Sequence, residues 1–332
     1  NWKFMINSQN NLTLAAIDIG TTNCRLLIAK PDQAGFRVVD SFSKVVRLGE
    51  GAFQTNTLSE KAIVRTISAL DVCASKMLKS SVTHSRIVAT EACRSAKKSD
   101  EFLMRVKKET GISIEVISSQ EEAELAFLGC SPLFADDKKN TIVFDIGGGS
   151  TELIWGSRDN EMVNQSVQAI SVPIGVVGLM DQYGGDRYDG NTYESIVTDC
   201  VSKLSVFPKL GSVKEMVADD MLELIGASGT VTALAGIQLG LKNYSRRRVD
   251  GSFLAFSELK EISKRLSRMT FKQRAALSCI GIERADLMVL GCAILEAICY
   301  VFPVEKLRVA DRGVREGILF SLMKETRINS LT

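Results

Sequence analysis

Short apolar runs alternate along the chain with stretches of helical periodicity, a pattern typical of α/β proteins. Residues 59–78 have apolar positions at helical spacing, on a stripe formed by Ile63, Ile67, Leu70, Ala74 and Leu78. Gly111 ends a second predicted helix over 100–110. Strand-like runs occur at 85–92, 112–118 and 168–174, and the last third of the chain is mainly helical.

One short pattern occurs twice. "AAIDIGTTNCRLLIA" at 15–29 aligns with "IVFDIGGGSTELIWG" at 142–156, so that Asp18 corresponds to Asp145 and Gly20 to Gly147. Each copy predicts a hairpin of two apolar strands around a glycine turn that a ligand can approach closely. We therefore expect two similar α/β domains facing each other across a cleft. The expected bounds are 1–134 and 135–311, with a C-terminal helix over 312–330 packing back on the first domain.

Composition and charge exclude several classes of protein. The chain is 45% apolar and 24% charged, which suits a buried core, and its net charge of +2 argues against nucleic acid as a partner. The eight cysteines contain no CxxC pair, and no signal stretch is recognisable, so we expect reduced, mostly buried thiols in a cytoplasmic protein. The longest apolar run, from Leu287, is interrupted by Glu296 and falls short of the roughly 20 residues that span a membrane. It predicts a core helix, and no membrane partner.

The second hairpin turn has the chemistry of a phosphate-binding loop. Backbone N–H groups and hydroxyls can surround an anion there, on Gly147, Gly148, Gly149, Ser150 and Thr151. Asp145 and Glu152 on either side could hold a divalent cation, directly or through water. The alternative is a plain tight hairpin, which requires neither the flanking acids nor a second copy.

The first turn offers the same arrangement with different side chains, and its candidate phosphate-binding residues are Thr21, Thr22, Asn23, Cys24 and Arg25. Thr90 and Arg94 follow a strand, where open α/β sheets bind ligands, although Arg94 could equally be an exposed arginine at a helix start. Gly229 and Thr230 stand at a strand-to-helix turn, and such helix N-termini attract phosphate.

The sequence suggests two different roles for Glu122, one catalytic and one structural. The single histidine, His84, argues against multi-histidine metal sites and phosphohistidine chemistry, so carboxylates are the expected proton-transfer groups. Glu122 could act as general base toward a water molecule. Ser119-x-x-Glu122 is also a capping box, in which Glu122 would only close a helix N-terminus.

The two hairpins and the "GASGT" turn resemble the actin-like (ribonuclease H-like) phosphotransferase superfamily. More narrowly, "ATEACRSA", "SSQEEAELAFLG", "DIGGGSTEL", "SVPIGVVGL" and "ADRGVREGIL" resemble the exopolyphosphatase / guanosine pentaphosphate phosphohydrolase (Ppx/GppA) family, in order from about residue 14 to 320. The resemblance implies magnesium-assisted hydrolysis of a terminal phosphoanhydride, with Glu122 as catalytic base, and a homodimer. It implies that Asp145 and Glu152 are metal-linked acids and that Arg25 and Arg94 contact phosphate.

Two departures from the family pattern affect these expectations. The family's first motif usually reads Ser-Asn-Ser or Thr-Asn-Asn, whereas this chain has Thr22 in place of the amide. Longer relatives carry an additional C-terminal helical domain, which we do not expect here.

The leading hypothesis is an exopolyphosphatase that releases orthophosphate from polyphosphate. The alternative is hydrolysis of guanosine pentaphosphate (pppGpp) at the same site, which the motifs cannot separate from the first. A sugar or acetate kinase of the same fold, and a non-catalytic sensor, are further alternatives.

Overall fold

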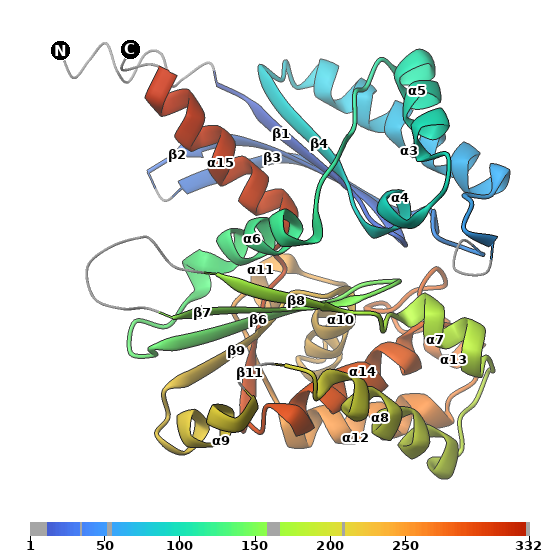
Figure 1. Cartoon of the computed structure of the whole chain (residues 1–332), viewed down its shortest axis with the longest axis vertical. Coiled ribbons are helices and arrows are strands. Elements are labelled where there is room, and N and C mark those ends of the chain that lie inside the picture. The colour runs from blue at the N-terminus through green and yellow to red at the C-terminus, as the bar shows by residue number, and fades with distance from the viewer. Residues whose placement is uncertain (1–11, 34, 52–54, 158–166, 208–209, 330–332) are drawn as a thin grey trace. The chain divides into compact units, whose positions relative to one another are not determined.

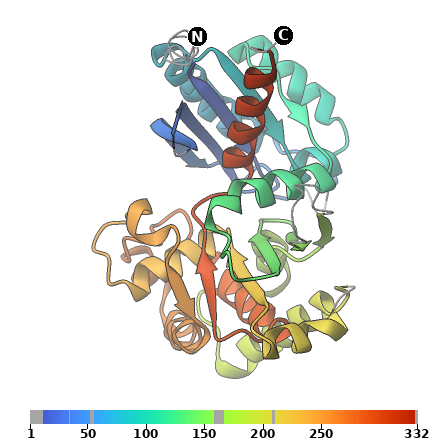
Figure 2. The same cartoon turned by 90° about the vertical axis from the view of Figure 1, so that its left-hand side faces the viewer.

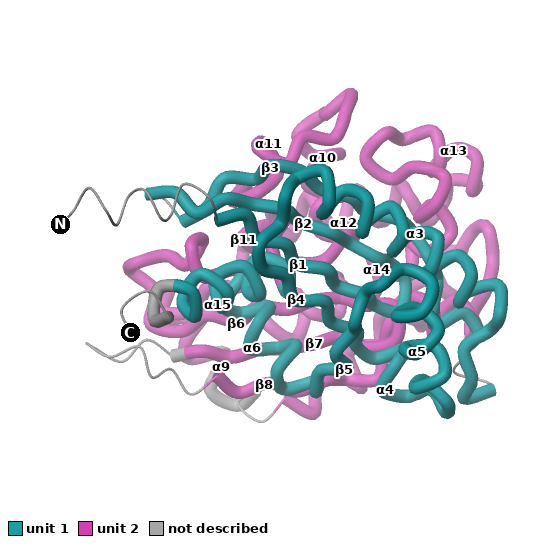
Figure 3. The backbone as a smooth tube through the Cα atoms, turned by 90° about the horizontal axis from the view of Figure 1, so that it is seen from above, with its two compact units in different colours: residues 1–129, 314–332 teal, residues 130–313 magenta. Residues whose placement is uncertain are grey.

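The computed structural model describes residues 12–33, 35–51, 55–157, 167–207 and 210–329 (Figure 1). The chain forms two compact units, coloured separately in Figure 3. Unit 1 contains residues 1–129 and 314–332, and unit 2 contains residues 130–313. Each unit has its own β-sheet with helices packed on it. The prediction of two α/β domains is therefore confirmed.

Unit 1 is built on a five-stranded sheet of order β3-β2-β1-β4-β5. Its strands are β1 (Leu14–Ile19), β2 (Asn23–Asp32), β3 (Gly35–Val45), β4 (His84–Ala89) and β5 (Glu115–Val116). β1 to β3 form an antiparallel meander, and β4 and β5 continue the sheet in parallel. The run at 112–118 thus forms only a two-residue strand, because pairing with β4 is limited to Glu115 and Val116.

The helices of unit 1 are α3 (Glu60–Lys79), α4 (Glu91–Ser95), α5 (Ser99–Thr110), α6 (Ser119–Cys130) and α15 (Val314–Asn329). Figures 1 and 2 show α15 lying along the sheet of unit 1. Residue 330, the last of the predicted C-terminal helix, lies outside the described residues. α5 ends as predicted, because Gly111 takes a left-handed conformation with φ of 75° and its N–H donates to the Lys107 carbonyl.

The predicted apolar stripe of α3 is only partly correct. Ile67 and Leu70 are buried in the core of unit 1, and Ile63 and Ala74 pack against it. Leu78, however, is 83% exposed. Cys73 is the last fully buried residue of α3, and in the last turn Met77 rather than Leu78 packs against the core.

Unit 2 is built on a six-stranded sheet of order β10-β11-β9-β6-β7-β8. Its strands are β6 (Asn140–Ile146), β7 (Thr151–Ser157), β8 (Gln168–Val172), β9 (Leu222–Gly226), β10 (Phe253–Ala255) and β11 (Lys306–Val309). Its helices are the 3₁₀ turn η1 (Ser131–Leu133), α7 (Val176–Tyr183), α8 (Gly190–Leu204), α9 (Leu210–Ala218), α10 (Gly229–Gln238), α11 (Arg246–Val249), α12 (Phe256–Arg268), α13 (Phe271–Ala275) and α14 (Met288–Val301).

α14 is the core helix that the apolar run predicted, since nearly all of its residues are buried between the sheet and α8 and α12. No helix within the described part of the chain is both long enough and apolar enough to cross a membrane. All eight cysteines are free and buried, as predicted.

The repeated sequence pattern forms the same structure in both units. β1 and β2 pair as an antiparallel hairpin, and so do β6 and β7. In both units the first strand of the hairpin also pairs in parallel with a later strand, β4 in unit 1 and β9 in unit 2. The two candidate loops therefore occupy equivalent places beside the ends of central parallel strands, where α/β sheets bind ligands.

Candidate functional site

The loop of unit 1 joins β1 to β2 and is closed by a hydrogen bond from the Gly20 N–H to the Asn23 carbonyl, 2.9 Å. Two polar atoms of this loop, Thr22 Oγ1 and Asn23 Oδ1, are buried and have no hydrogen-bond partner among the described residues. A buried polar atom without a partner is costly, so these two atoms are candidates for contact with a ligand or water.

Residues 46–49, here called the bracing segment, hold the outer side of this loop. The Thr22 carbonyl accepts hydrogen bonds from the N–H groups of Val46 (2.8 Å) and Arg47 (2.9 Å), and the Thr21 carbonyl accepts one from Gly49 (3.0 Å). A Cβ on Gly49 would lie 2.3 Å from the Thr21 side chain, which explains the glycine. The bracing segment therefore occupies the loop carbonyls and fixes their peptide planes.

Asp18 and Arg25 are directly opposite each other in the β1–β2 register. Burial raises the pKa of Asp18, while Arg25 and Arg315 act to lower it and Glu316 to raise it further. Asp18 is a partly buried carboxylate beside the loop, and it is a candidate functional residue that the sequence analysis aligned with Asp145 but did not place in the site. The alignment of the two repeats is the sequence signal that could have identified Asp18 as a site residue.

The predicted site residue Cys24 points the other way. Its side chain is fully buried in the core of unit 1, and its pKa is raised by a hydrogen bond with Cys73 and by burial. Any contact of Cys24 with a phosphate would have to come from its backbone.

Thr90 and Arg94 follow β4. Thr90 is buried, and its N–H donates to the Ile19 carbonyl at 3.1 Å, which places it beside the end of β1. Thr90 is also the N-cap residue of α4, although its side chain makes no capping hydrogen bond.

The Arg94 guanidinium forms an ion pair with Glu122 at 2.8 Å, with both side chains 17% exposed. It also donates to Glu91 (3.0 Å) and to the Ile117 carbonyl (3.0 Å). Burial disfavours the charged guanidinium, but the charges of Glu122 and Glu91 outweigh this and raise the pKa of Arg94. The structure thus brings two predicted site residues together, and Arg94 orients the carboxylate of Glu122.

The cap contact at the start of α6 lies one residue earlier than the predicted capping box of Ser119 and Glu122. The Glu121 N–H donates to Ser118 Oγ at 3.1 Å, and the Glu122 N–H donates to the Ser118 carbonyl at 3.0 Å. Ser118, outside the helix, therefore makes the cap contact in place of Ser119. The Glu121 side chain pairs with Arg86 at 2.5 Å, so the two neighbouring glutamates have different partners.

The loop of unit 2 repeats the closure of the first. The Gly147 N–H donates to the Ser150 carbonyl at 2.9 Å. The carbonyls of this loop also accept hydrogen bonds. The N–H groups of Val176 and Val177 donate to the carbonyls of Gly147 (3.1 Å) and Gly148 (2.8 Å). Here the first turn of α7 performs the role that the bracing segment has in unit 1.

The start of α7 lies very close to this loop. A Cβ on Gly175 would lie 2.4 Å from the Gly148 carbonyl and 2.5 Å from the Gly149 nitrogen, so no larger residue fits there. Thr151 Oγ1 donates to the Ile174 carbonyl at 2.7 Å, which ties β7 to the same segment. The motif "SVPIGVVGL" thus supports the glycine loop directly.

Asp145 and Glu152 are directly opposite each other in the β6–β7 register. Glu152 is buried and accepts from Ser150 (2.5 Å) and Ser171 (3.0 Å) through Oε1. Like charges directly opposite each other on two strands repel, and a divalent cation bound by both carboxylates would offset that repulsion. Among the described residues no group of three or more acidic, cysteine or histidine side chains forms a metal site. One or two carboxylates, completed by water and substrate phosphates, are the usual protein ligands of Mg²⁺, and this pair fits that description.

The "GASGT" turn lies beside the same strand end. The Ala227 N–H donates to the Phe144 carbonyl at 2.9 Å, and Ser228 caps α10 by accepting from Val231. Gly229 and Thr230 therefore begin a helix next to Asp145. Thr230 packs against α14, where a Cβ on Gly291 would lie 2.3 Å from its hydroxyl.

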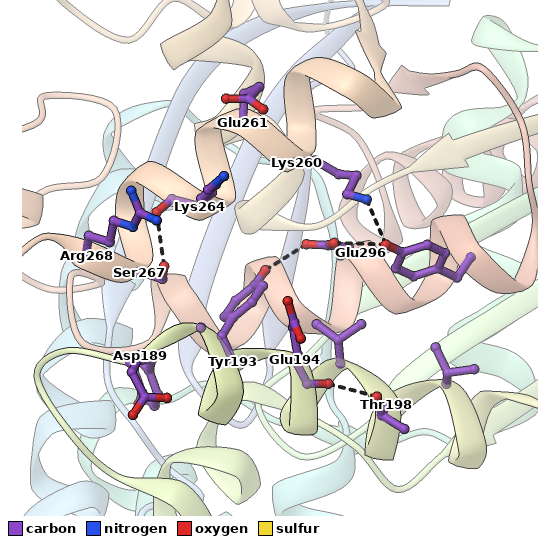
Figure 4. Close-up of a pocket in the computed structure, with 15 residues that line it drawn as sticks. Asp189, Tyr193, Glu194, Thr198, Lys260, Glu261, Lys264, Ser267, Arg268 and Glu296 are labelled. Carbon is purple, nitrogen blue, oxygen red and sulfur yellow. Dashed lines mark hydrogen bonds between the residues drawn. The ribbon is translucent and has the colours of Figure 1, made fainter.

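A cavity of about 990 Å³ lies elsewhere in unit 2, between α8, α12 and α14, and none of the predicted site residues lines it (Figure 4). Its floor contains Glu296, which accepts from Tyr193 (3.1 Å) and Tyr300 (3.4 Å), and Lys260 donates to Tyr300. Burial raises the pKa of Glu296. Side chains of both charges line the cavity, so its chemistry does not select a phosphate.

The sequence of this chain is similar to known proteins over a range that includes both units. Residues 27–326 match the model described as the Ppx/GppA phosphatase family. A guanosine-5'-triphosphate,3'-diphosphate pyrophosphatase of Vibrio vulnificus is 28% identical over 324 residues, which cover 97% of this chain but only 62% of that protein. Exopolyphosphatase 2 of Mycobacterium tuberculosis is 29% identical over 323 residues, covering 93% of this chain and 98% of that protein.

The fold also has a solved counterpart. The crystal structure of the Aquifex aeolicus member of the Ppx/GppA family has a TM-score of 0.75 to this chain at 27% sequence identity. The match covers 95% of this chain and 98% of the Aquifex chain, so it includes both units.

Proposed function

The chain belongs to the Ppx/GppA phosphatase family, which confirms the resemblance seen in its motifs, and we propose that it is an exopolyphosphatase. It would hydrolyse the terminal phosphoanhydride of inorganic polyphosphate and release orthophosphate. The named Mycobacterium relative supports this substrate. The named Vibrio relative supports a second candidate, the 5'-phosphohydrolysis of pppGpp by the same residues.

The observation that carries the proposal is the pair of buried, unpartnered atoms in the first loop, Thr22 Oγ1 and Asn23 Oδ1. The N–H groups of the bracing segment donate to the loop carbonyls, so they are not available to these two side-chain atoms. A phosphate oxygen would accept from the Thr22 hydroxyl. A water molecule of the phosphate's hydration shell would donate to the Asn23 oxygen. A hydrated phosphate therefore satisfies both atoms.

A divalent cation, which we propose is magnesium, would be held by Asp145 and Glu152. When bound, it would neutralise charge on the phosphate oxygens and so stabilise the charge distribution of phosphoryl transfer. The hydroxyls of Ser150 and Ser171 hold Glu152 Oε1 in one orientation. The N–H groups of Gly148 and Gly149 can face phosphate because α7 holds the carbonyl side of the loop.

Glu122 would act as general base. Its carboxylate takes a proton from the attacking water while the water oxygen bonds to the terminal phosphorus. The bridging phosphorus–oxygen bond breaks, and its electron pair leaves on the shortened polyphosphate. Arg94 holds Glu122 in place for this step and adds positive charge near the reacting group.

The direct test is release of orthophosphate by the purified protein with magnesium and either polyphosphate or pppGpp. Comparison of kcat/KM for the two substrates decides between the candidates. Release without any sugar or acetate excludes a kinase, and binding of polyphosphate without turnover would replace the proposal by the non-catalytic sensor.

Thr22→Val tests the carrying observation. The variant keeps the shape of the side chain and removes the unpartnered hydroxyl, so the protein should remain as stable as the parent or become more stable. Loss of a hydrogen bond to a charged group should lower kcat/KM about tenfold or more. The control is Thr66→Val, because the Thr66 hydroxyl already donates to the Ala62 carbonyl within α3. Equal activity of the Thr22 variant and the parent would contradict this role of the loop.

A further inference from the structure

Arg65, in the first half of α3, contacts the bracing segment from the side opposite the phosphate loop. Its Nε donates to the Val46 carbonyl at 2.9 Å and its Nη2 to the Arg47 carbonyl at 3.4 Å. The N–H groups of these same two residues donate to the Thr22 carbonyl. The guanidinium therefore lies one peptide layer behind the loop, and its hydrogen bonds within the described residues go to Val46, Arg47 and Glu50.

The bracing segment has a conformation that requires such support. Arg47 has a φ of 48°, in the left-handed region that residues other than glycine rarely adopt. Strained backbone of this kind persists where surrounding contacts determine it more than once. At Arg47 the N–H is held by Thr22 and the carbonyl by Arg65, so both sides of the strained residue are fixed.

A surface ion pair alone does not explain the position of Arg65. Its Nη2 also contacts Glu50 at 2.7 Å, but these side chains are 40% and 55% exposed, and exposed pairs contribute little. The two carbonyl contacts depend on the planar fork of donors that only arginine provides. The geometry indicates that the main structural role of Arg65 is to hold the bracing segment.

We propose that Arg65 is a positioning residue for the phosphate loop, a proposal that rests on the proposed function. It holds the bracing segment, the bracing segment holds the Thr22 peptide, and the Thr22 hydroxyl is thereby aimed at the phosphate. Arg65 does not touch substrate in this scheme. Arg65 reduces the conformational freedom of the phosphate loop before substrate binds.

The test compares Arg65→Met and Arg65→Lys with a matched control, Arg105→Met. Arg105 is also a partly exposed arginine of unit 1, with ion pairs to Glu60 (2.6 Å) and Glu109 (2.7 Å), but all of its hydrogen bonds go to carboxylates. The first measurement is native-state hydrogen exchange of the amides of Val46, Arg47 and Gly49, without substrate. The second is kcat/KM for polyphosphate with magnesium.

In Arg65→Met we expect these three amides to exchange at least tenfold faster than in the parent. The equivalent amides of unit 2, on Val176 and Val177, should not change. kcat/KM should fall about tenfold, Arg65→Lys should lie between parent and Arg65→Met because it keeps one charged donor, and Arg105→Met should match the parent.

Two results would overturn the inference: exchange at 46, 47 and 49 that is the same in Arg65→Met and Arg105→Met, or equal losses of kcat/KM in both. If Arg65→Met fails to fold, Arg65→Lys is judged by the same amides. A parent protein that releases no phosphate would refute the proposed function, while the exchange measurement would still decide whether Arg65 holds the loop.

Discussion

Replacement of Glu122 by glutamine separates a catalytic from a structural role. The substitution keeps the size of the side chain and its ability to accept from Arg94, but an amide cannot take a proton from water. A positioned general base contributes about a hundredfold to ten-thousandfold in rate. This corresponds to about 2.7–5.4 kcal/mol in the activation free energy. We expect kcat to fall within that range.

The structural cost of this substitution should be small. The Arg94–Glu122 pair becomes a hydrogen bond to a neutral group, a loss of about 1 kcal/mol in the free energy of unfolding. Arg94 keeps its contacts with Glu91 and the Ile117 carbonyl, so it remains in place. For a protein of this size the loss should lower Tm by only about 1–2 °C.

Glu121→Gln is the matched control, one residue earlier on α6. Its carboxylate pairs with Arg86 and has no predicted part in the reaction. Initial rates of orthophosphate release across a range of polyphosphate concentrations give kcat and KM for both variants, and thermal unfolding gives Tm. A Glu122 variant within about threefold of the parent kcat, or a Glu121 variant that loses as much as the Glu122 variant, would refute the assignment of the base.

Three further outcomes follow from the structure. Asp145→Ala should abolish magnesium-dependent phosphate release while Tm stays close to that of the parent, and equal activity across a magnesium titration would contradict its metal role. Gly175→Ala should lower kcat/KM at least tenfold, because the added Cβ would lie 2.4 Å from the Gly148 carbonyl and must displace the phosphate loop; an unchanged rate would show that α7 does not set the loop. Glu296→Gln should leave activity unchanged and alter the pH dependence of stability. Burial raises the pKa of Glu296 above its ordinary value of 4.5, so the protonated form is favoured in the folded state and the parent loses stability as the pH rises through the folded pKa. The variant stays neutral, so its free energy of unfolding relative to the parent should increase from acid to neutral pH, and a constant difference across that range would contradict this.

The parts of the fold that depend on a short window of sequence could be predicted. The two hairpins follow from apolar runs on either side of a glycine turn, and the end of α5 follows from one glycine in a left-handed conformation. The correspondence of Asp18 with Asp145 is a property of the aligned letters. It holds in the structure because equal local patterns form equal hairpins.

The parts that depend on which distant segments meet could not be predicted. The Thr22 carbonyl is held by residues about two dozen positions later, and the glycine loop of unit 2 by the first turn of α7, at a similar separation. No periodicity marks these contacts. They exist because a buried carbonyl needs a donor, and only the packed structure determines which donor is near.

The two glutamates of α6 show the same division within a single turn of helix. The sequence by itself placed them at the start of a helix and, through the family motif, singled out Glu122. Only the tertiary structure decided that Arg86 pairs with Glu121 and that Arg94 pairs with Glu122. The physical reason is that helix propensity acts over neighbouring residues, whereas an ion pair requires two charged groups that only the folded chain brings within reach.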